Sequence, residues 1–284
     1  MRSFIFIVIS LFFLQSYADT SIWSVSNGKN TIYLGGTIHI LKPTDYPLPQ
    51  EYETAYKKVG WLVFETDINA IESPEFIQQF AQQMMLPKND HLQKHLSPEV
   101  YQRLVKEAVK RQWPMEHFNR MRPQMVALTI SIEAIQQLGY TAQGVDSHFN
   151  NKAKRDSKIT SHLESAQQQL KILTNMASEN EDELLIQTLD DLPDIKNLMQ
   201  KLADAWRTGN RLALIEHGLL DMDKEFPEMY QDMIKQRNDN WMPIVENLIK
   251  HPEEKMVLVG ALHLIGKDGL LQRLEKKGYT IKQL

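Results

Sequence analysis

Apolar and polar residues alternate in two short stretches near the start of the chain, at 22–26 and 31–34. Asn27 and Gly28 stand between the two stretches, and an Asn-Gly pair flanked by alternating residues is a strong signal for a β-hairpin. The second stretch runs on through two glycines to His39. The pattern therefore predicts an N-terminal hairpin whose second strand ends beside a histidine.

Two apolar runs deeper in the chain end abruptly in an acidic residue. The run 61–65 ends at Glu65, and the weaker run 159–164, which His162 interrupts, ends at Glu164. Apolar runs of this length are typical of short buried strands. Both runs therefore predict strands that carry a carboxylate at their carboxyl ends.

Helical patterns fill most of the chain between these runs and its end, at 73–139 and 166–250. Ser73 precedes Pro74, and a second Ser-Pro pair stands at 97–98, which is the signature of an N-cap followed by proline in the first helical turn. The strand pattern returns only in the last 30 residues or so of the chain, as judged from its periodicity.

The strands at 256–260 and 279–281 complete a simple architecture. Strands lie at both ends of the chain and helices fill the middle, which predicts an α/β (α+β) fold with a central sheet built from both chain ends and a large helical insertion as a cap. Within the cap, the acidic segment 178–194 is predicted to be a solvated helical pair.

The first 18 residues are predicted to be a secretion signal. One positive charge at Arg2 precedes a short apolar run at 4–14, and small residues lead up to Ala18, after which cleavage is expected. The run is too short to span a bilayer comfortably. We expect residues 19–284 to form a single exported domain with no stable membrane span after cleavage.

Composition narrows the class of protein further. The chain has no Cys, so its core must form without disulfides and its chemistry cannot use thiolates. The net charge is −4 at pH 7, with no basic stripe, which argues against a nucleic-acid partner. Export, missing Cys and mild acidity together favour a bacterial periplasm, while the oligomeric state is left open.

Two distant segments repeat one pattern, an apolar strand followed by Gly-x-x-His. Gly36 and His39 form the first unit, and Gly260 and His263 form the second. Such an echo suggests two related halves that meet at one site. Glycine at a strand end lets the backbone turn close to a ligand, and histidine offers a nitrogen ligand to a divalent metal. One such unit would carry little weight, because a buried His after a strand is often a hydrogen-bonded core residue.

The acidic strand ends extend this candidate site. His39, His263 and Glu65 form a donor set suited to a catalytic divalent metal, which would activate water and polarise a carbonyl. Glu164 is a candidate further ligand or general base, and Arg237 a candidate oxyanion stabiliser. A helix cap or a salt bridge explains Glu164 and Arg237 equally well.

The ordered set of motifs resembles the TraB/PrgY/GumN family, which is related to the Tiki metalloproteases. The segments that carry the resemblance span nearly all of the chain after the signal: 34–39, 47–49, 63–67, 144–146, 163–164 with Gln168, 206–210, 237–241, 259–264 and 269–271. The resemblance implies a site made of His39, His263, Glu65 and Arg237. It also implies a divalent metal, with Mn²⁺ or Co²⁺ favoured and Zn²⁺ as a third option, and peptide-bond hydrolysis. Asp146 lies in one motif without an assigned role.

Two functions remain open on the sequence alone. The first is an exported metal-dependent hydrolase, in particular a peptidase, acting on a peptide or small-molecule substrate. The second is a non-catalytic periplasmic protein that binds or sequesters a peptide or small-molecule signal. Turnover of peptides with added Mn²⁺ would separate the two.

Overall fold

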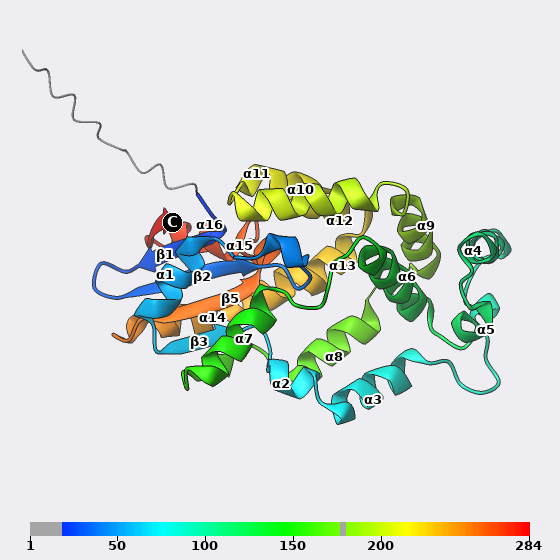
Figure 1. Cartoon of the computed structure of the whole chain (residues 1–284), viewed down its shortest axis with the longest axis horizontal. Helices are drawn as coiled ribbons and strands as arrows, with labels where there is room; N and C mark the ends of the chain where they lie inside the picture. Colours follow the sequence, from blue (N-terminus) through cyan, green and yellow to red (C-terminus); the bar gives the residue numbers. More distant parts are fainter. Residues whose placement is uncertain (1–18, 177–179) are drawn as a thin grey trace, which may run out of the picture.

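The structure is a computed structural model that describes residues 19–176 and 180–284 (Figure 1). The expected signal peptide, residues 1–18, lies outside the described residues. Among the residues that are described, no helix combines the length and the apolar character needed to cross a membrane.

A six-stranded mixed sheet forms the centre of the molecule, in the order β4-β3-β5-β2-β1-β6. Its strands are β1 (Ile22–Ser26), β2 (Thr31–Thr37), β3 (Trp61–Phe64), β4 (Ile159–His162), β5 (Lys255–Gly260) and β6 (Thr280–Gln283). The neighbours β4, β3, β5 and β2 run parallel, whereas β1 is antiparallel to both β2 and β6. The predicted sheet assembled from both chain ends is confirmed.

The N-terminal hairpin forms where its sequence predicts. The side chain of Asn27 accepts hydrogen bonds from the backbone N–H groups of Lys29 and Asn30 and so closes the turn. Gly28 takes a φ of +88°, a left-handed conformation that glycine adopts without steric cost. The turn fixes the register in which Ile22 pairs with Gly35.

The two Gly-x-x-His units lie on adjacent parallel strands, β2 and β5. Gly36 pairs with Val259 and Thr37 pairs with Gly260, so the two units are offset by one residue. A Cβ on Gly36 would lie 3.0 Å from Ala261, which shows how closely the second unit approaches the first. The sheet therefore brings both units to the same edge.

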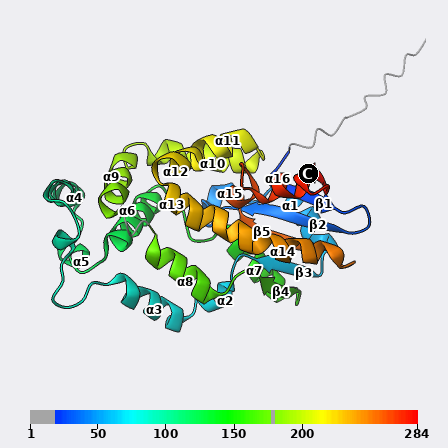
Figure 2. The same cartoon turned by 180° about the vertical axis from the view of Figure 1, so that it is seen from behind.

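Helices cover both faces of the sheet. Helices α1 (Gln50–Lys58) and α7 (Val145–Arg155) lie on the face of the sheet that is in front in Figure 1. Helix α14 (Gln236–Lys250) lies across the opposite face, which is in front in Figure 2. The main core between these layers is aliphatic and aromatic, with Trp23, Trp206 and Trp241 all buried. Burial of such side chains is the main driving force for folding.

The remaining helices form the predicted insertion and the chain end. They are α2 (Ile68–Ile71), α3 (Pro74–Met84), α4 (Pro98–Arg111), α5 (Met115–Phe118), α6 (Pro123–Gln137), α8 (Ala166–Asn175), α9 (Glu181–Asp191), α10 (Ile195–Arg207), α11 (Arg211–Gly218), α12 (Leu220–Glu225), α13 (Pro227–Tyr230), α15 (Ala261–Leu264) and α16 (Leu270–Lys276), with the short turns η1 (Pro43–Asp45) and η2 (Leu92–Lys94). Ser73 caps α3 as its Ser-Pro pair predicts, by accepting from the N–H of Phe76.

The cap has a hydrophobic cluster of its own, separate from the core around the sheet. It joins α4, α5, α6 and α9 and includes Leu104, Phe118 and Ile130. The prediction of a solvated helical pair at 178–194 is wrong for the part that is described. A single helix, α9, covers 181–191, and its Leu185 and Leu189 are buried in the cap cluster because they lie on one helical face.

Candidate functional site

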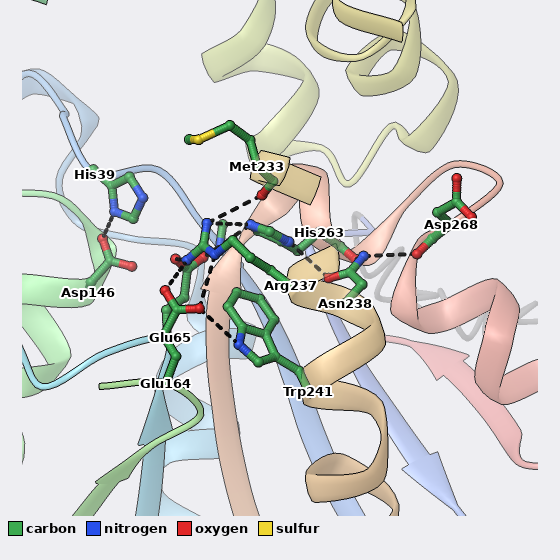
Figure 3. A network of polar contacts seen from close by, with 11 residues as sticks. His39, Glu65, Asp146, Glu164, Met233, Arg237, Asn238, Trp241, His263 and Asp268 are labelled. Atoms are coloured by element: carbon green, nitrogen blue, oxygen red, sulfur yellow. Dashed lines mark hydrogen bonds and ion pairs between the residues drawn. The ribbon is translucent and has the colours of Figure 1, made fainter. Parts of the chain in front are cut away.

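The predicted site residues collect at the carboxyl ends of the four parallel strands (Figure 3). His39 follows β2, Glu65 directly follows β3, and Glu164 follows β4. His263 lies in the short helix α15, immediately after β5. This edge is where α/β sheets place their ligand sites, because the strand ends open into loops there.

Arg237 of α14 joins the two carboxylates. Its Nε donates to Glu164 at 3.1 Å, and its Nη2 donates to Glu164 at 2.8 Å and to Glu65 at 2.6 Å. All three side chains are almost completely buried. The paired contact with Glu164 uses the fork geometry in which a guanidinium binds a carboxylate most strongly.

A π-helical turn, η3 (Gln231–Lys235), directly precedes α14, the helix that carries Arg237. Such turns displace the backbone register of a helix and are frequent at functional sites. Here the carbonyl of Met233 accepts a hydrogen bond from Nη1 of Arg237 at 3.4 Å. The turn therefore helps to aim the guanidinium at the strand ends.

Glu65 is held ionised despite its burial. Burial alone would raise the pKa of this carboxyl, but Arg237, His263 and His39 together with the backbone N–H of Gly260 lower it to about 2. That N–H donates to Oε1 of Glu65 at 2.5 Å. Gly260, which ends β5, thus contributes a backbone donor to the site in addition to its conformational freedom.

Glu164 has a different balance of effects on its proton affinity. Burial raises the pKa of this carboxyl, against the opposing effect of Arg237. The indole Nε1 of Trp241 donates to it at 3.2 Å. Two carboxylates on one arginine are thus pushed toward different proton affinities, an arrangement found where one group must stay charged and the other must exchange protons.

His263 is buried between Arg237 and two further residues of α14. Its Nε2 lies 3.0 Å from Nη1 of Arg237, and its Nδ1 lies 2.9 Å from Oδ1 of Asn238. The ring of Trp241 packs on it with a centroid distance of 4.5 Å. Burial lowers the pKa of His263 to about 3, so the ring is neutral at pH 7. We call Glu65, Glu164, Arg237 and His263 the central network.

His39 has the opposite environment. Its Nδ1 lies 2.8 Å from Oδ2 of Asp146, and 64% of its side chain is exposed. Asp146 raises the pKa of His39 to about 9, so this ring is charged at pH 7. Figure 3 shows the pair at the side of the central network, with Asp146 coming from the start of α7. Asp146 thus acquires the role that its motif alone did not reveal.

Both histidines act on the same carboxylate, that of Glu65. Nε2 of His263 is 3.9 Å from Oε1 of Glu65, and the charge of His39 contributes to the lowered pKa of Glu65. The echo in the sequence therefore corresponds to a shared location, although one ring is buried and neutral and the other is exposed and charged.

The candidate ligands are of the residue types that bind divalent metals, but their present arrangement is not that of a metal site. Each histidine has its Nδ1 engaged by an oxygen acceptor, the outer-shell pattern that orients Nε2 for a metal. The guanidinium of Arg237, however, already contacts both His263 and Glu65. Across residues 19–176 and 180–284, no three His, Asp or Glu side chains lie close enough together to hold an ion. Binding a metal there would require Arg237 to leave Nε2 of His263.

A pocket of about 430 Å³ reaches the central network between α8 and α14. Glu164, Arg237 and Trp241 form part of its wall, and the apolar side chains of Ile172 and Ile244 also line it. Four carboxamides, two charged side chains and one leucine complete the wall, namely Gln168, Asn175, Gln236, Asn240, Lys171, Asp232 and Leu163. A concave pocket in which several polar groups converge beside apolar side chains can hold a small ligand.

Two residues that the sequence reasoning missed complete the site. Asn238 and Trp241 contact His263. Both belong to the motif 237–241 that contains Arg237, and this shared motif is the feature of the sequence that could have indicated them. The pair His91 and His95 lies in the cap. His95 bonds to Asp90 there and takes no part in the central network.

Comparison with known proteins gives a match over nearly the whole chain. The family model described as TraB/PrgY/gumN family matches residues 21–283. Neither the search of curated proteins nor the search of solved structures found a significant match.

Proposed function

The chain belongs to the TraB/PrgY/gumN family, and on this premise we propose that it is an exported metal-dependent hydrolase that cleaves peptide, amide or ester bonds. The observation that carries the proposal is the gathering of Glu65, Glu164, Arg237 and His263 into one buried network beside His39. Burying that much charge is costly, and such clusters occur where chemistry needs them.

In this proposal His39, His263 and Glu65 would hold a divalent metal such as Mn²⁺ or Co²⁺. When bound, the metal would supply a water of lowered pKa and polarise the scissile carbonyl. The raised pKa of His39 means that its ring must lose a proton before Nε2 becomes a ligand, so metal binding would release a proton.

The residues of the chain itself account for the other needs of hydrolysis. Arg237 provides a fixed positive charge for the oxyanion, in a buried place where such a charge acts strongly. Glu164, whose pKa is raised, is the carboxylate suited to accept the proton of the attacking water. Glu65, whose pKa is about 2, stays charged and balances Arg237.

The pocket between α8 and α14 supports a substrate that contains amide groups. Its carboxamides can both donate to and accept from a peptide backbone, and Ile172 and Ile244 suit an apolar side chain. We propose that the part of the substrate next to the scissile bond lies there. The alternative of pure sequestration uses the same pocket without chemistry, and it is favoured by the existing contacts that tie Arg237 within the protein.

Metal content tests the ligand assignment. Protein purified from the periplasm without chelators is expected to retain a divalent metal by elemental analysis. His39→Ala and His263→Ala are expected to lose it while keeping the far-ultraviolet circular dichroism of the parent. His91→Ala is the matched control, since His91 is exposed and lies in the cap. Full metal content in either site variant would contradict the assignment.

Turnover tests the reaction. A peptide library incubated with the protein and Mn²⁺ is expected to yield cleavage products that disappear in Arg237→Met. Saturable binding of peptides with no cleavage under the same conditions would support sequestration instead. The two readouts separate the activity from the metal site.

A further inference from the structure

Asn238 lies fully buried directly behind His263, on the side away from Glu65. Its Nδ2 donates to two backbone carbonyls, that of His263 at 3.0 Å and that of Asp268 at 2.8 Å. Its Oδ1 faces Nδ1 of His263 at 2.9 Å. Figure 3 shows these contacts as a chain that leads from Asp268 through Asn238 to His263.

The two carbonyls determine which end of the carboxamide is the nitrogen. A carbonyl only accepts hydrogen bonds, so the atom that contacts both of them must be the NH₂ group. If the amide of Asn238 were turned over, its oxygen would face two carbonyl oxygens in a buried place, at the cost of two lost hydrogen bonds. The oxygen must therefore be the atom that faces His263.

This orientation determines where His263 carries its proton. Oδ1 of Asn238 has no hydrogen to give, so Nδ1 of His263 must be the donor. In a neutral ring Nε2 then keeps its lone pair. The guanidinium of Arg237, which only donates, lies 3.0 Å from that nitrogen and agrees with the assignment. Two neighbours on opposite edges of the ring thus favour the same tautomer.

We infer that Asn238 is a positioning residue that holds His263 as its Nδ1–H tautomer and keeps the Nε2 lone pair directed at Glu65 and Arg237. Consecutive residues of one helix therefore grip both ring nitrogens, and Trp241, one turn later, packs on the ring face. Asp268 ties the arrangement to the loop before α16, because its carbonyl accepts from Asn238 and its carboxylate accepts from Tyr230.

The chemical use of this arrangement rests on the proposed function. A neutral ring with an unprotonated Nε2 can ligate a metal or accept a proton at that atom, whereas the Nε2–H tautomer can do neither there. Loss of an outer-shell partner of this kind typically lowers metal affinity or activity about 10- to 100-fold. We expect Asn238→Ala to lower Mn²⁺ affinity by a factor in that range.

The decisive measurement is the tautomer itself, in metal-free protein. Long-range proton–nitrogen correlation spectra of protein with ¹⁵N-labelled histidine distinguish protonated from unprotonated ring nitrogens. The His263 signals are identified by their disappearance in His263→Gln. In the unmodified protein at neutral pH, His263 is expected to show Nδ1 protonated and Nε2 unprotonated. An Nε2–H tautomer there would overturn the inference, whatever the protein hydrolyses.

Three variants separate the two roles of the Asn238 side chain, which accepts from Nδ1 of His263 and donates to two backbone carbonyls. Asn238→Asp keeps an acceptor at Nδ1 but loses both donors, so the tautomer is expected to persist in a less stable protein. Asn238→Ala loses the acceptor, so signals of the Nε2–H form are expected. Asn247→Ala, an exposed position on the same helix, is the control and is expected to leave the His263 spectrum unchanged.

Each outcome has one meaning. If Asn238→Ala folds and keeps the Nδ1–H form unmixed, Arg237 alone sets the tautomer and the inference fails. If that variant does not fold, the spectra of the unmodified protein and of Asn238→Asp still decide. A confirmed tautomer in a protein that cleaves nothing would support the positioning role and reject the hydrolase.

Discussion

At the scale of single residues, the two histidines of the repeated motif have diverged in charge. His263 is enclosed by Arg237, Asn238 and Trp241, and burial keeps its ring neutral. His39 lies in the open beside Asp146, which keeps its ring charged. One motif can therefore serve two electrostatic purposes, because the neighbours of a ring, more than its place in the chain, set its proton affinity.

Removal of the Asp146 charge tests this explanation of His39. Asp146→Asn is expected to lower the pKa of His39 from about 9 toward its ordinary value of 6.5, because the attraction of the carboxylate is the main cause of the shift. Titration of the His39 ring signals by nuclear magnetic resonance measures the change. Asp156→Asn is the control from the other end of α7 and is expected to leave the pKa of His39 unchanged. A pKa that stays near 9 in Asp146→Asn would assign the shift to another group.

The sequence predicts residue types at this site better than it predicts their partners. His39, Glu65 and His263 can be found because each follows an apolar strand, and strand ends of parallel strands meet. The pairing of His39 with Asp146 joins residues 107 positions apart. No local pattern encodes such a contact, since it depends on how α7 packs against the loop after β2.

At the scale of elements, the backbone at the start of α7 packs closely against the backbone of the loop after β2. Gly144 precedes α7, and a Cβ placed on it would lie 2.3 Å from the carbonyl oxygen of Ile38 and 2.4 Å from backbone atoms of His39. The N–H of Val145 donates to the same Ile38 carbonyl at 3.0 Å. The missing side chain of glycine therefore lets the first turn of α7 dock on the loop that carries His39.

Gly144→Ala is accordingly expected to disturb both stability and the site. Backbone atoms must move to admit the methyl group, and overpacking of this kind costs about 1 to 3 kcal/mol. The same movement separates Asp146 from His39, so the pKa of His39 is expected to fall. Urea unfolding and ring titration measure the two effects.

The control for this variant is Gly60→Ala. No atom lies within 4 Å of the point that a Cβ on Gly60 would occupy, and Gly60 has no positive φ, so the substitution is expected to be neutral or slightly stabilising. Equal stability of the two variants would show that the loop yields freely, and that the close approach does not hold His39 in place.

The helices illustrate why element prediction succeeds in parts. Ser-Pro pairs mark the starts of α3 and α4 because capping is a local interaction. The acidic segment is harder to predict since its charge hides the apolar face of α9, which needs the other cap helices to bury it. The π-helical turn before Arg237 forms where the sequence pattern predicts only a regular helix.

At the scale of the whole molecule, the sheet and the cap insertion follow from the order of strand and helix patterns. Three features cannot be predicted in this way, because they depend on packing between distant segments. They are the strand order, the one-residue offset between the two Gly-x-x-His units and the contact of α14 with His263. The central network therefore exists only in the complete fold, and its protonation is coupled to the stability of the entire chain.

This coupling predicts a stability maximum near pH 6.5 for the metal-free protein. The pKa of His263 is about 3 when folded and 6.5 otherwise, so its contribution is complete above pH 6.5 and is lost as the pH falls toward 3. The loss amounts to about 1.4 kcal/mol per pH unit for one proton. Below pH 4.5, Glu65 acts in the same direction, since its folded pKa is about 2.

The alkaline side of the maximum comes from His39. Its folded pKa is about 9, so its contribution is complete below pH 6.5 and is lost as the pH rises to 9. Because the ring is mostly exposed, solvent screening is expected to keep this decline shallow. Asp146→Asn is expected to flatten it further.

Urea unfolding at a series of pH values, with a chelator present, measures the curve. His263→Gln is expected to lower stability at pH 7 but to lose the one-proton slope between pH 6.5 and 4.5, so its curve should converge on that of the parent as the pH falls. His148, whose pKa is also lowered by burial, is unchanged in both proteins, so the difference between the curves isolates His263. Parallel curves through that interval would mean that the folded protein takes up a proton at His263 as easily as the unfolded chain does, and the central network could not then be the closed, neutral-imidazole site described above.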